Sequence, residues 1–257
     1  MSQPSIQIAQ RFCGPPQSGN GGYVAGRLAA FLEAPAVGVR LRIPPVLETE
    51  LAVQVSAEEA SLYDGASLIA EARPVELTIV PPTAPSFDES IRAAKRFRGF
   101  DEHVFPGCFV CGPERTVEEG LRIFPGETDR PALFAAPWVP KSSLLSDLLP
   151  DASSASPGEG MVGSRTIPNE FLWAALDCPG AFAFPQPKGK VILLGEMQAA
   201  ISGSVSVDEP CVLASWEIEA KGRKHLSGSA LYGEEGDCRG VALGVWFEVD
   251  ADAVPSS

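Results

Sequence analysis

The chain has few of the features that mark membrane, secreted or nucleic-acid-binding proteins. No apolar run approaches the roughly 20 residues that a membrane-spanning helix needs. Residues 1–5 carry neither positive charge nor an apolar stretch, so no signal peptide is visible. Only 20 Lys and Arg stand against 33 Asp and Glu, for a net charge of −13, and such a surface repels a polyanion. We therefore expect a cytoplasmic protein that binds neither membranes nor nucleic acid.

Histidine is also scarce, and this limits the chemistry that the chain can perform. There are 2 histidines and 6 cysteines among the 257 residues. Cys108 and Cys111 form a C-x-x-C pair, but a structural zinc site takes four ligands and no second pair completes one. Without an export signal, free thiols are expected rather than disulfides. A G-x-S-x-G motif is missing, which argues against a Ser-His-Asp hydrolase. The sequence thus predicts no metal site, and we interpret the C-x-x-C pair as structural.

What the chain does contain is a pattern that occurs twice. In each half, a short helix rich in small or apolar residues precedes a series of alternating strands. The first helix is expected to follow Asn20, a good N-cap; its glycines and alanines make it dependent on burial. The second is expected to start at Asn169 and to stop at Pro179. Period-2 alternation predicts strands within 37–43, 51–55, 75–79, 196–201, 214–219 and 241–247. Further strands are expected within 6–12, 66–72, 121–124 and 226–232. This repetition indicates an antiparallel sheet with one buried face.

A turn-rich stretch and a basic segment separate the two halves. We place an N-terminal unit at residues 1–85, a basic linker helix at 86–107 and a C-terminal unit at 108–251, with a flexible insertion near 139–166. The basic side chains of the linker have two interpretations: a patch that holds the phosphates of an anionic ligand, or solvated charges paired with nearby acids. These side chains are Arg92, Lys95, Arg96 and Arg98, and Arg223 with Lys224 form a second candidate patch.

One acidic residue distinguishes the second helix from the first. Asp177 lies in an apolar run between Leu176 and Cys178, whereas the first helix has no acid. Desolvation by such neighbours raises the pKa of a carboxyl group towards useful base strength. Alternatively, Asp177 simply ends its helix, where it faces solvent or caps the last turn. A charge in that turn is poorly placed against the helix dipole, which is a mild indication of function. Both interpretations remain open.

The order of several motifs resembles that of double-hotdog acyl-CoA thioesterases, including those of the phenylacetyl-CoA type. In the first half, the likeness lies in the Gly-Gly helix start at 20–25. In the second half, it lies in the Cys pair at 108–112, which 120–121 follow, in Leu176-Asp177 followed by Gly180, and in the stretch 222–236. It covers most of residues 10–80 and 105–249. The resemblance implies an α+β fold: a tandem (double) hotdog in which each long antiparallel sheet wraps around a central Ala/Gly-rich helix.

The resemblance also implies an activity, the hydrolysis of acyl-CoA thioesters at one composite site between the hotdogs. Gly21 corresponds to the glycine whose N–H polarises the thioester carbonyl, and Asp177 to the general base or nucleophile. A helix N-terminus suits a developing oxyanion. The second site would be silent, because Ala29 (or Leu28, one residue away) replaces its acid and Asn169 its glycine. No cofactor is expected, since coenzyme A is part of the substrate.

Further substrate contacts are expected around this pair, each with a structural alternative. Asn20 is also a plain N-cap, and the glycines also allow close helix packing. The candidate contacts are Asn20, Gly22, Tyr23, Asn169, Trp173, Arg223 and Lys224. Two other functions stay open: a non-catalytic acyl-CoA or acyl-carrier binding protein, and an enoyl-CoA hydratase of the same fold, which needs an Asp/His pair. A homodimer is plausible for this family.

Overall fold

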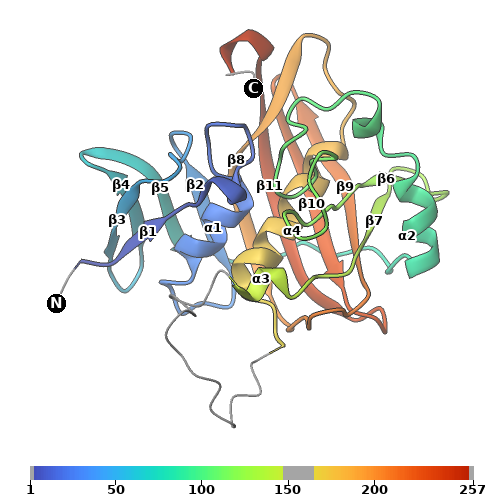
Figure 1. Ribbon diagram of the computed structural model, residues 1–257, viewed down its shortest axis with the longest axis horizontal. Helices are drawn as coiled ribbons and strands as arrows, with labels where there is room; N and C mark the ends of the chain where they lie inside the picture. The colour runs from blue at the N-terminus through green and yellow to red at the C-terminus, as the bar shows by residue number, and fades with distance from the viewer. Residues whose placement is uncertain (1–2, 147–164, 255–257) are drawn as a thin grey trace.

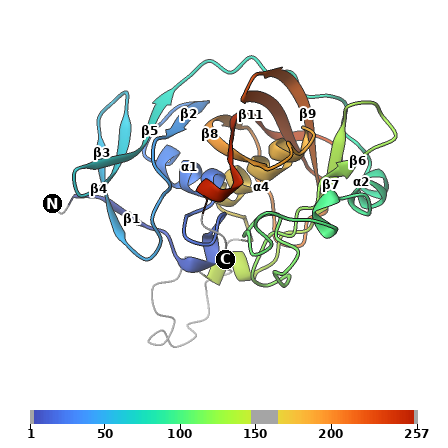
Figure 2. The same cartoon turned by 90° about the horizontal axis from the view of Figure 1, so that it is seen from above.

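The computed structural model describes residues 3–146 and 165–254, and its main feature is one antiparallel sheet of 11 strands. The strand order is β1-β3-β4-β5-β2-β8-β11-β10-β9-β7-β6 (Figures 1 and 2). The strands are β1 (Ser5–Gln7), β2 (Val37–Leu41), β3 (Glu50–Val55), β4 (Ala60–Asp64), β5 (Ser67–Pro74), β6 (Gly126–Glu127), β7 (Phe134–Trp138), β8 (Lys190–Ile201), β9 (Cys211–Lys221), β10 (Lys224–Tyr232) and β11 (Cys238–Asp250).

Four helices and three short 3-10 turns accompany the described part of the sheet. The helices are α1 (Gly21–Ala29), α2 (Phe87–Ala94), α3 (Ser143–Ser146) and α4 (Asn169–Phe182), and the turns are η1 (Gln10–Phe12), η2 (Arg98–Phe100) and η3 (Ala251–Ala253). None of these helices is both long and apolar enough to cross a membrane.

The two halves of the chain meet at the pairing of β2 with β8. Val37 lies opposite Ala199 and Val39 opposite Met197, so the sheet continues from one half into the other. Arg40 and Glu196 form an ion pair of 2.9 Å across the same two strands. The long strands β8, β9 and β11 curve over α4 in Figure 2, and α1 lies against β2, β4, β5 and β8. Each half therefore contributes one helix to the same side of a shared sheet.

Helices α1 and α4 pack against each other because α1 carries glycines at the contact (Figure 1). A Cβ added at Gly22 would lie 2.4 Å from Asp177 Cβ and 2.7 Å from the Trp173 carbonyl oxygen. At Gly26 it would lie 2.7 Å from Glu170 Cα. Real carbon contacts are about 3.5–4.0 Å, so only glycine permits this approach. The expectation that α1 depends on burial is confirmed, since most of it is buried.

The beginning of α1 is as predicted, whereas the end of α4 is not. Asn20 caps α1, its Oδ1 accepting the Tyr23 N–H at 2.9 Å. Helix α4 runs past the predicted stop and ends at Phe182 with Pro179 inside. A proline costs one helical hydrogen bond, but tertiary contacts hold this segment: Arg98 donates to the Phe182 carbonyl at 3.1 Å. The interpretation of Asp177 as a helix-ending residue is therefore wrong.

Three predicted strands differ in the structure, because a strand also needs a neighbouring strand with which to form hydrogen bonds. Only part of 6–12 is strand, and η1 follows it. Residues 75–79 alternate between half-buried and exposed, but the chain there crosses over the sheet, as the teal segment after β5 shows in Figure 2. Residues 121–124 instead bond to a loop, with Leu121 N–H donating to the Phe109 carbonyl at 2.8 Å. Strand β4 was not predicted.

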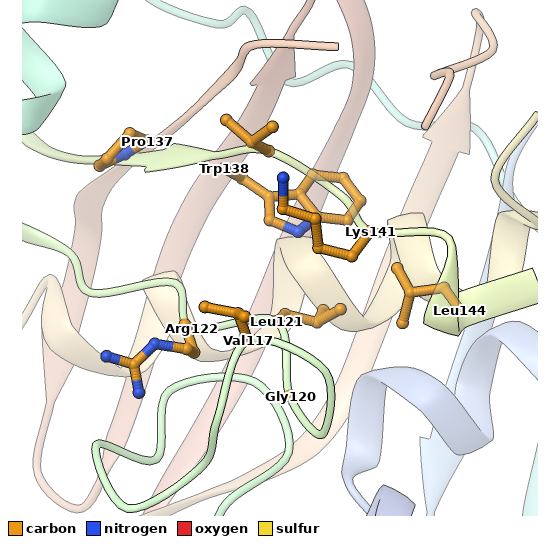
Figure 3. A pocket seen from close by; sticks show the side chains of 9 residues that line it. Val117, Gly120, Leu121, Arg122, Pro137, Trp138, Lys141 and Leu144 are labelled. Atoms are coloured by element: carbon orange, nitrogen blue, oxygen red, sulfur yellow. The ribbon is translucent and has the colours of Figure 1, made fainter. Parts of the chain in front are cut away.

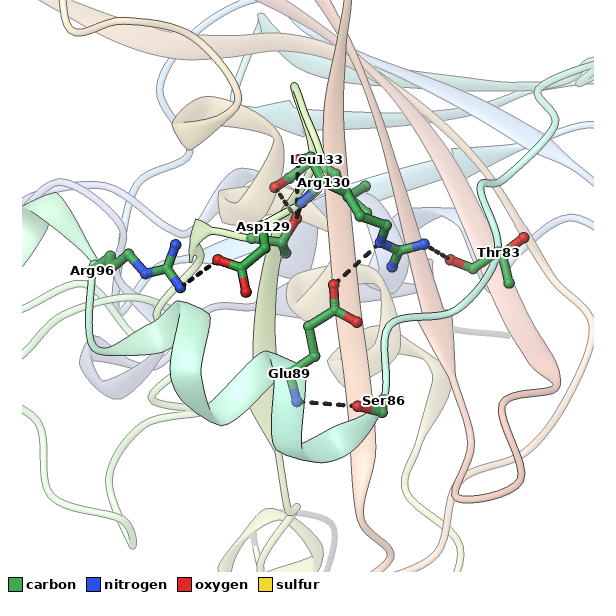
Figure 4. Close-up of polar contacts among 8 residues, drawn as sticks. Thr83, Ser86, Glu89, Arg96, Asp129, Arg130 and Leu133 are labelled. Carbon is green, nitrogen blue, oxygen red and sulfur yellow. Dashed lines mark hydrogen bonds and ion pairs between the residues drawn. The ribbon is translucent and has the colours of Figure 1, made fainter.

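Only the first part of the predicted linker helix is helical, as α2, which Ser86 caps by accepting the Glu89 N–H at 3.1 Å. The helix packs on β6 and β7. Figure 4 shows its polar attachments: Glu89 pairs with Arg130 at 3.2 Å and Arg96 with Asp129 at 3.0 Å. These contacts direct the following residues back towards α4. Of the expected insertion near 139–166, residues 147–164 lie outside the described residues.

Candidate active site

A cavity of about 960 Å³ lies where the start of α1 meets α4. Its wall also includes the segment after α2 and the first part of β8. The polar end is formed by Asn20, Gly21, Cys108, Cys111, Asp177 and Cys178, and apolar side chains such as Phe182, Leu193, Leu194 and Trp246 line other parts. A cavity with an apolar wall and a few convergent polar groups is typical of a small-molecule site.

The Asp177 carboxylate is buried at the meeting point of the two helices, with 4% of the residue exposed. Its Oδ2 accepts hydrogen bonds from the Asn20 side-chain amide and from the Gly22 N–H, each at 2.9 Å. Within the described residues, its Oδ1 is buried without a hydrogen-bond partner. One oxygen is therefore held in place by the first half of the chain, and the other is a buried acceptor without a hydrogen bond among the described residues.

Burial changes the proton affinity of this carboxyl group. Desolvation raises the pKa of Asp177 from 3.8 to about 7, against the opposing effects of the hydrogen bonds from Gly22 and Asn20. Burial disfavours the charged form, while donors to that form favour it. A carboxyl group whose pKa lies near neutrality is suited to exchange protons with a reacting molecule.

Gly21 is the second residue of the predicted catalytic pair. It is the first residue of α1 and lines the same cavity. No hydrogen bond from its N–H is found among the described residues, whereas the N–H of Gly22 donates to Asp177. Unpaired N–H groups at a helix N-terminus attract negative charge. The structure thus brings together Gly21 and Asp177, the two residues to which the resemblance assigned catalysis.

The other predicted contacts fall into two groups. Asn20 and Gly22 lie at the site, where both hold the carboxylate. The other five are not among the described residues that line the cavity. Two are buried in the core: the Tyr23 ring stacks on Phe12 with centroids 4.2 Å apart, and Trp173 packs on α1. Three are exposed: Asn169 at the start of α4, Arg223 in the β9–β10 turn and Lys224 at the start of β10.

The basic linker contributes one cation to the cavity wall. Arg98 lines it, donates to the Ala181 and Phe182 carbonyls, and lies over the Phe182 ring. Burial lowers the pKa of this arginine. The other three basic side chains of the linker are solvent-exposed, and Arg96 is paired with Asp129. Solvated surface charge is thus the correct interpretation for most of the segment.

A cluster of three thiols lies beside the carboxylate and was missed by the sequence analysis. The sulfur atoms of Cys108, Cys111 and Cys178 all lie within 4.8 Å of one another. Cys108 Sγ and Cys178 Sγ are 3.7 Å apart, although 70 positions separate them in the sequence. All six cysteines are free. The C-x-x-C signal was visible, but its third partner depends on how α4 packs.

The two histidines occupy different environments. His103 lines the cavity; its Nδ1 accepts the Phe105 N–H at 3.0 Å, and its Nε2 is buried without a partner among the described residues. Burial lowers the pKa of His103, so the ring is neutral at physiological pH. His225 lies on β10, where Nε2 is 2.8 Å from Glu248, and it is not among the residues that line the cavity.

A second, smaller cavity of about 200 Å³ lies near β7 and α3 (Figure 3). Its described lining includes Trp138, Leu144, Arg122 and Lys141, but no carboxylate, histidine or thiol. Lys141 is already paired with Asp208 at 3.1 Å. Of these two cavities, the larger is the one whose described lining includes carboxylate, histidine and thiol groups.

Solved structures of similar fold cover almost the whole chain. The TesB protein of Mycobacterium avium subspecies paratuberculosis is 12% identical, over 95% of this chain and 92% of that chain, with a TM-score of 0.56. An acyl-CoA thioesterase II, TesB2, from Mycobacterium marinum is 9% identical, over 96% and 92%, with a TM-score of 0.54. The dehydratase domain of a mycocerosic acid synthase-like PKS is 13% identical, over 96% and 90%, with a TM-score of 0.58.

At the level of sequence, no family model matches the chain and no curated protein matches it. The structural likeness establishes the fold: a large antiparallel sheet with a few helices, of the hotdog type that the resemblance predicted.

Proposed function

We propose that this chain hydrolyses acyl-CoA thioesters at one composite site between two hotdog units. The observation that carries the proposal is the juxtaposition of a buried carboxylate on α4 with the unpaired N–H of Gly21 at the start of α1, on the wall of one cavity. Thioesterases of similar fold support it.

The double-hotdog organisation is part of this proposal. Helix α1 lies mainly against strands of the first half and α4 against strands of the second, which agrees with an N-terminal unit at 1–85, a linker at 86–107 and a C-terminal unit at 108–251. Because the site uses α1 of one unit and α4 of the other, neither unit contains it alone.

The geometry suggests a route for hydrolysis. The thioester carbonyl oxygen accepts the Gly21 N–H, and Asp177 Oδ1 takes a proton from a water molecule as that water attacks the carbonyl carbon. The tetrahedral oxyanion is stabilised by the N–H and by the positive end of α1. Collapse breaks the C–S bond, and the coenzyme A thiolate takes the proton from Asp177. Asn20 and Gly22 hold Oδ2, so that Oδ1 points to the reacting centre.

An alternative in which Asp177 attacks the carbonyl itself gives the same products through a mixed anhydride. A single turnover in oxygen-18 water detects the anhydride route when water attacks the aspartyl carbon of the anhydride. Direct water attack puts the label in the released acid, whereas hydrolysis of an anhydride at its aspartyl carbon puts it in the enzyme.

The test of the proposal is a panel of acyl-CoAs assayed for thiol release, with Asp177→Asn as the informative variant. Loss of general-base catalysis reduces the rate by about 10²–10⁴-fold. Asp101→Asn is the matched control, because Asp101 is an exposed carboxylate on the same wall. Circular dichroism and thermal unfolding verify folding. Wild-type rates in Asp177→Asn, or no turnover of any acyl-CoA by the wild type, refute the proposal; tight binding without turnover indicates an acyl-CoA binding protein instead.

Hydration of an enoyl thioester is a second candidate, favoured by one specific observation. His103 and Asp177 both line the cavity and each has a buried polar atom without a partner in the described residues. A dehydratase domain also has a similar fold. Loss of the enoyl absorbance without thiol release, abolished by His103→Gln, would favour this reaction over hydrolysis.

A further inference from the structure

The thiol cluster beside Asp177 has no part in the proposed hydrolysis, which needs only a carboxylate, an N–H group and water. Cys108 and Cys111 are buried, Cys178 is half-buried, and all three line the cavity. Buried thiols are common as small apolar side chains. Three of them in mutual contact, contributed by two separate segments, form a potential ligand set instead.

The backbone around the C-x-x-C pair is folded into a tight turn that directs both sulfurs the same way. The Gly112 N–H donates to the Cys108 carbonyl at 3.0 Å. A Cβ at Gly112 would lie 2.4 Å from that same oxygen, so the turn requires glycine. The backbone N–H groups of Cys111 and Val110 hydrogen-bond the Cys108 sulfur. Such donors stabilise a thiolate, the form in which cysteine binds metals.

The spacing of the sulfurs fits one metal ion. With a Zn–S bond of about 2.3 Å and tetrahedral angles, two thiolates lie about 3.8 Å apart. The observed separation of Cys108 Sγ and Cys178 Sγ is 3.7 Å, and Cys111 Sγ is within 4.8 Å of both. A disulfide between any two would require an S–S length of about 2.05 Å and leave the third thiol unused.

We propose that Cys108, Cys111 and Cys178 together bind one zinc ion, with the fourth coordination position facing the cavity and filled by water. Binding is a ligand exchange without oxidation or reduction: three thiols release three protons to solvent, and three thiolates with Zn²⁺ form a site of net charge −1. Thiolate ligands select zinc among the common divalent ions.

The ion would connect the 105–112 loop to α4 at the residue that follows Asp177. Fixing Cys178 in this way restrains the turn of α4 that carries the carboxylate, so the three cysteines act as positioning residues. Cysteine ligands from two distant segments also explain why the loop closes on α4. This inference does not depend on the proposed hydrolysis.

The direct measurement is the metal content of the wild-type protein, produced with zinc and a reductant and then dialysed. We expect one zinc per chain, and X-ray absorption at the zinc edge showing three sulfurs at about 2.3 Å with one lighter ligand. Replacement by Co²⁺ should give a sulfur-to-cobalt charge-transfer band and the visible bands of a tetrahedral site.

Variants then identify the ligands. Cys178→Ser should bring the zinc content close to zero, whereas Cys211→Ser, which removes a buried thiol from β9 outside the cluster, should retain one zinc. If Cys178→Ser does not fold, the sulfur count in the wild type decides.

Three results would overturn the proposal: a reduced wild type that retains no zinc, a spectrum with fewer than three sulfurs, or equal zinc loss in Cys211→Ser. A protein mass two hydrogens low without metal would indicate a disulfide instead. All these readouts are independent of acyl-CoA hydrolysis, so failure of one proposal is distinguishable from failure of the other.

Discussion

The contact between α1 and α4 at Gly22 gives the sharpest test of this structure. Replacing Gly22 with alanine places a Cβ 2.4 Å from Asp177 Cβ and 2.7 Å from the Trp173 carbonyl oxygen. Normal contacts are about 3.5–4.0 Å, so the helices must separate by roughly 1 Å. One obstacle is backbone and the other is the Cβ of a buried helical residue. Neither moves by a side-chain rotation.

The expected cost follows from these distances. Because both new contacts are shorter than 3 Å, we take the upper part of the usual cost of overpacking, about 2–3 kcal/mol, which outweighs the gain in helix propensity of about 1 kcal/mol. Taking a net loss of about 1–2 kcal/mol, the midpoint of thermal unfolding falls by roughly 2–8 °C for a chain of this size. The separation also lengthens the 2.9 Å bond from Gly22 to Asp177 Oδ2, and a misplacement of this size can reduce kcat by about 10²-fold.

Gly21→Ala is the matched control one residue earlier in the same helix. There the new Cβ meets Leu194 Cδ2 at 2.9 Å and Leu41 Cδ1 at 3.0 Å. Both are ends of flexible side chains, so we expect a change within about 0.5 kcal/mol. Urea and thermal unfolding, followed by circular dichroism, measure both variants. Equal stability of Gly22→Ala and the wild type, or an equal loss in both variants, would refute the close helix contact.

Three further predictions concern the surroundings of this contact. Because the pKa of Asp177 rises from 3.8 to about 7 on folding, its protonation contributes stability that is fully present below about pH 4 and is lost as pH rises through 7. In metal-free protein, Asp177→Asn should therefore be more stable than the wild type at pH 8 by a few kcal/mol and equally stable near pH 4. Urea titrations at the two pH values measure this difference, and equal stability of the two proteins at both pH values would contradict the prediction. Ser229 Oγ donates to the buried Leu176 carbonyl at 2.6 Å, so Ser229→Ala should lower the free energy of unfolding by about 1–3 kcal/mol, with no loss in urea denaturation as the refuting result. Arg98→Gln removes the donors to the carbonyl of Phe182 at the end of α4 and should lower the unfolding midpoint while hydrogen exchange in the last turn becomes faster; unchanged exchange would count against this role.

Part of this fold could be predicted from the types of residue that are neighbours in the sequence. Asn20 carries a capping side chain and three glycines follow in its helix, so α1 and its dependence on burial were predictable. Strands with continuous alternation, such as β9 and β11, were also predictable. Residues 75–79 show the limit, since they alternate equally well but cross the sheet without pairing to it. A side-chain pattern reports which face is buried, whereas strand pairing depends on a neighbour elsewhere in the chain.

The site divides in the same way. The residue types alone indicated a carboxylate in an apolar helix and a glycine at another helix start, and the family resemblance suggested that they act together. Only the tertiary structure decided the contacts around them. Gly22 and Asn20 hold Asp177 because glycines of α1 let α1 and α4 approach closely. Cys178 joins the C-x-x-C pair because the packing of α4 brings it beside Cys108 and Cys111. Helix starts and buried faces are set by neighbours in sequence, but a cluster drawn from segments 70 residues apart exists only once the chain has packed.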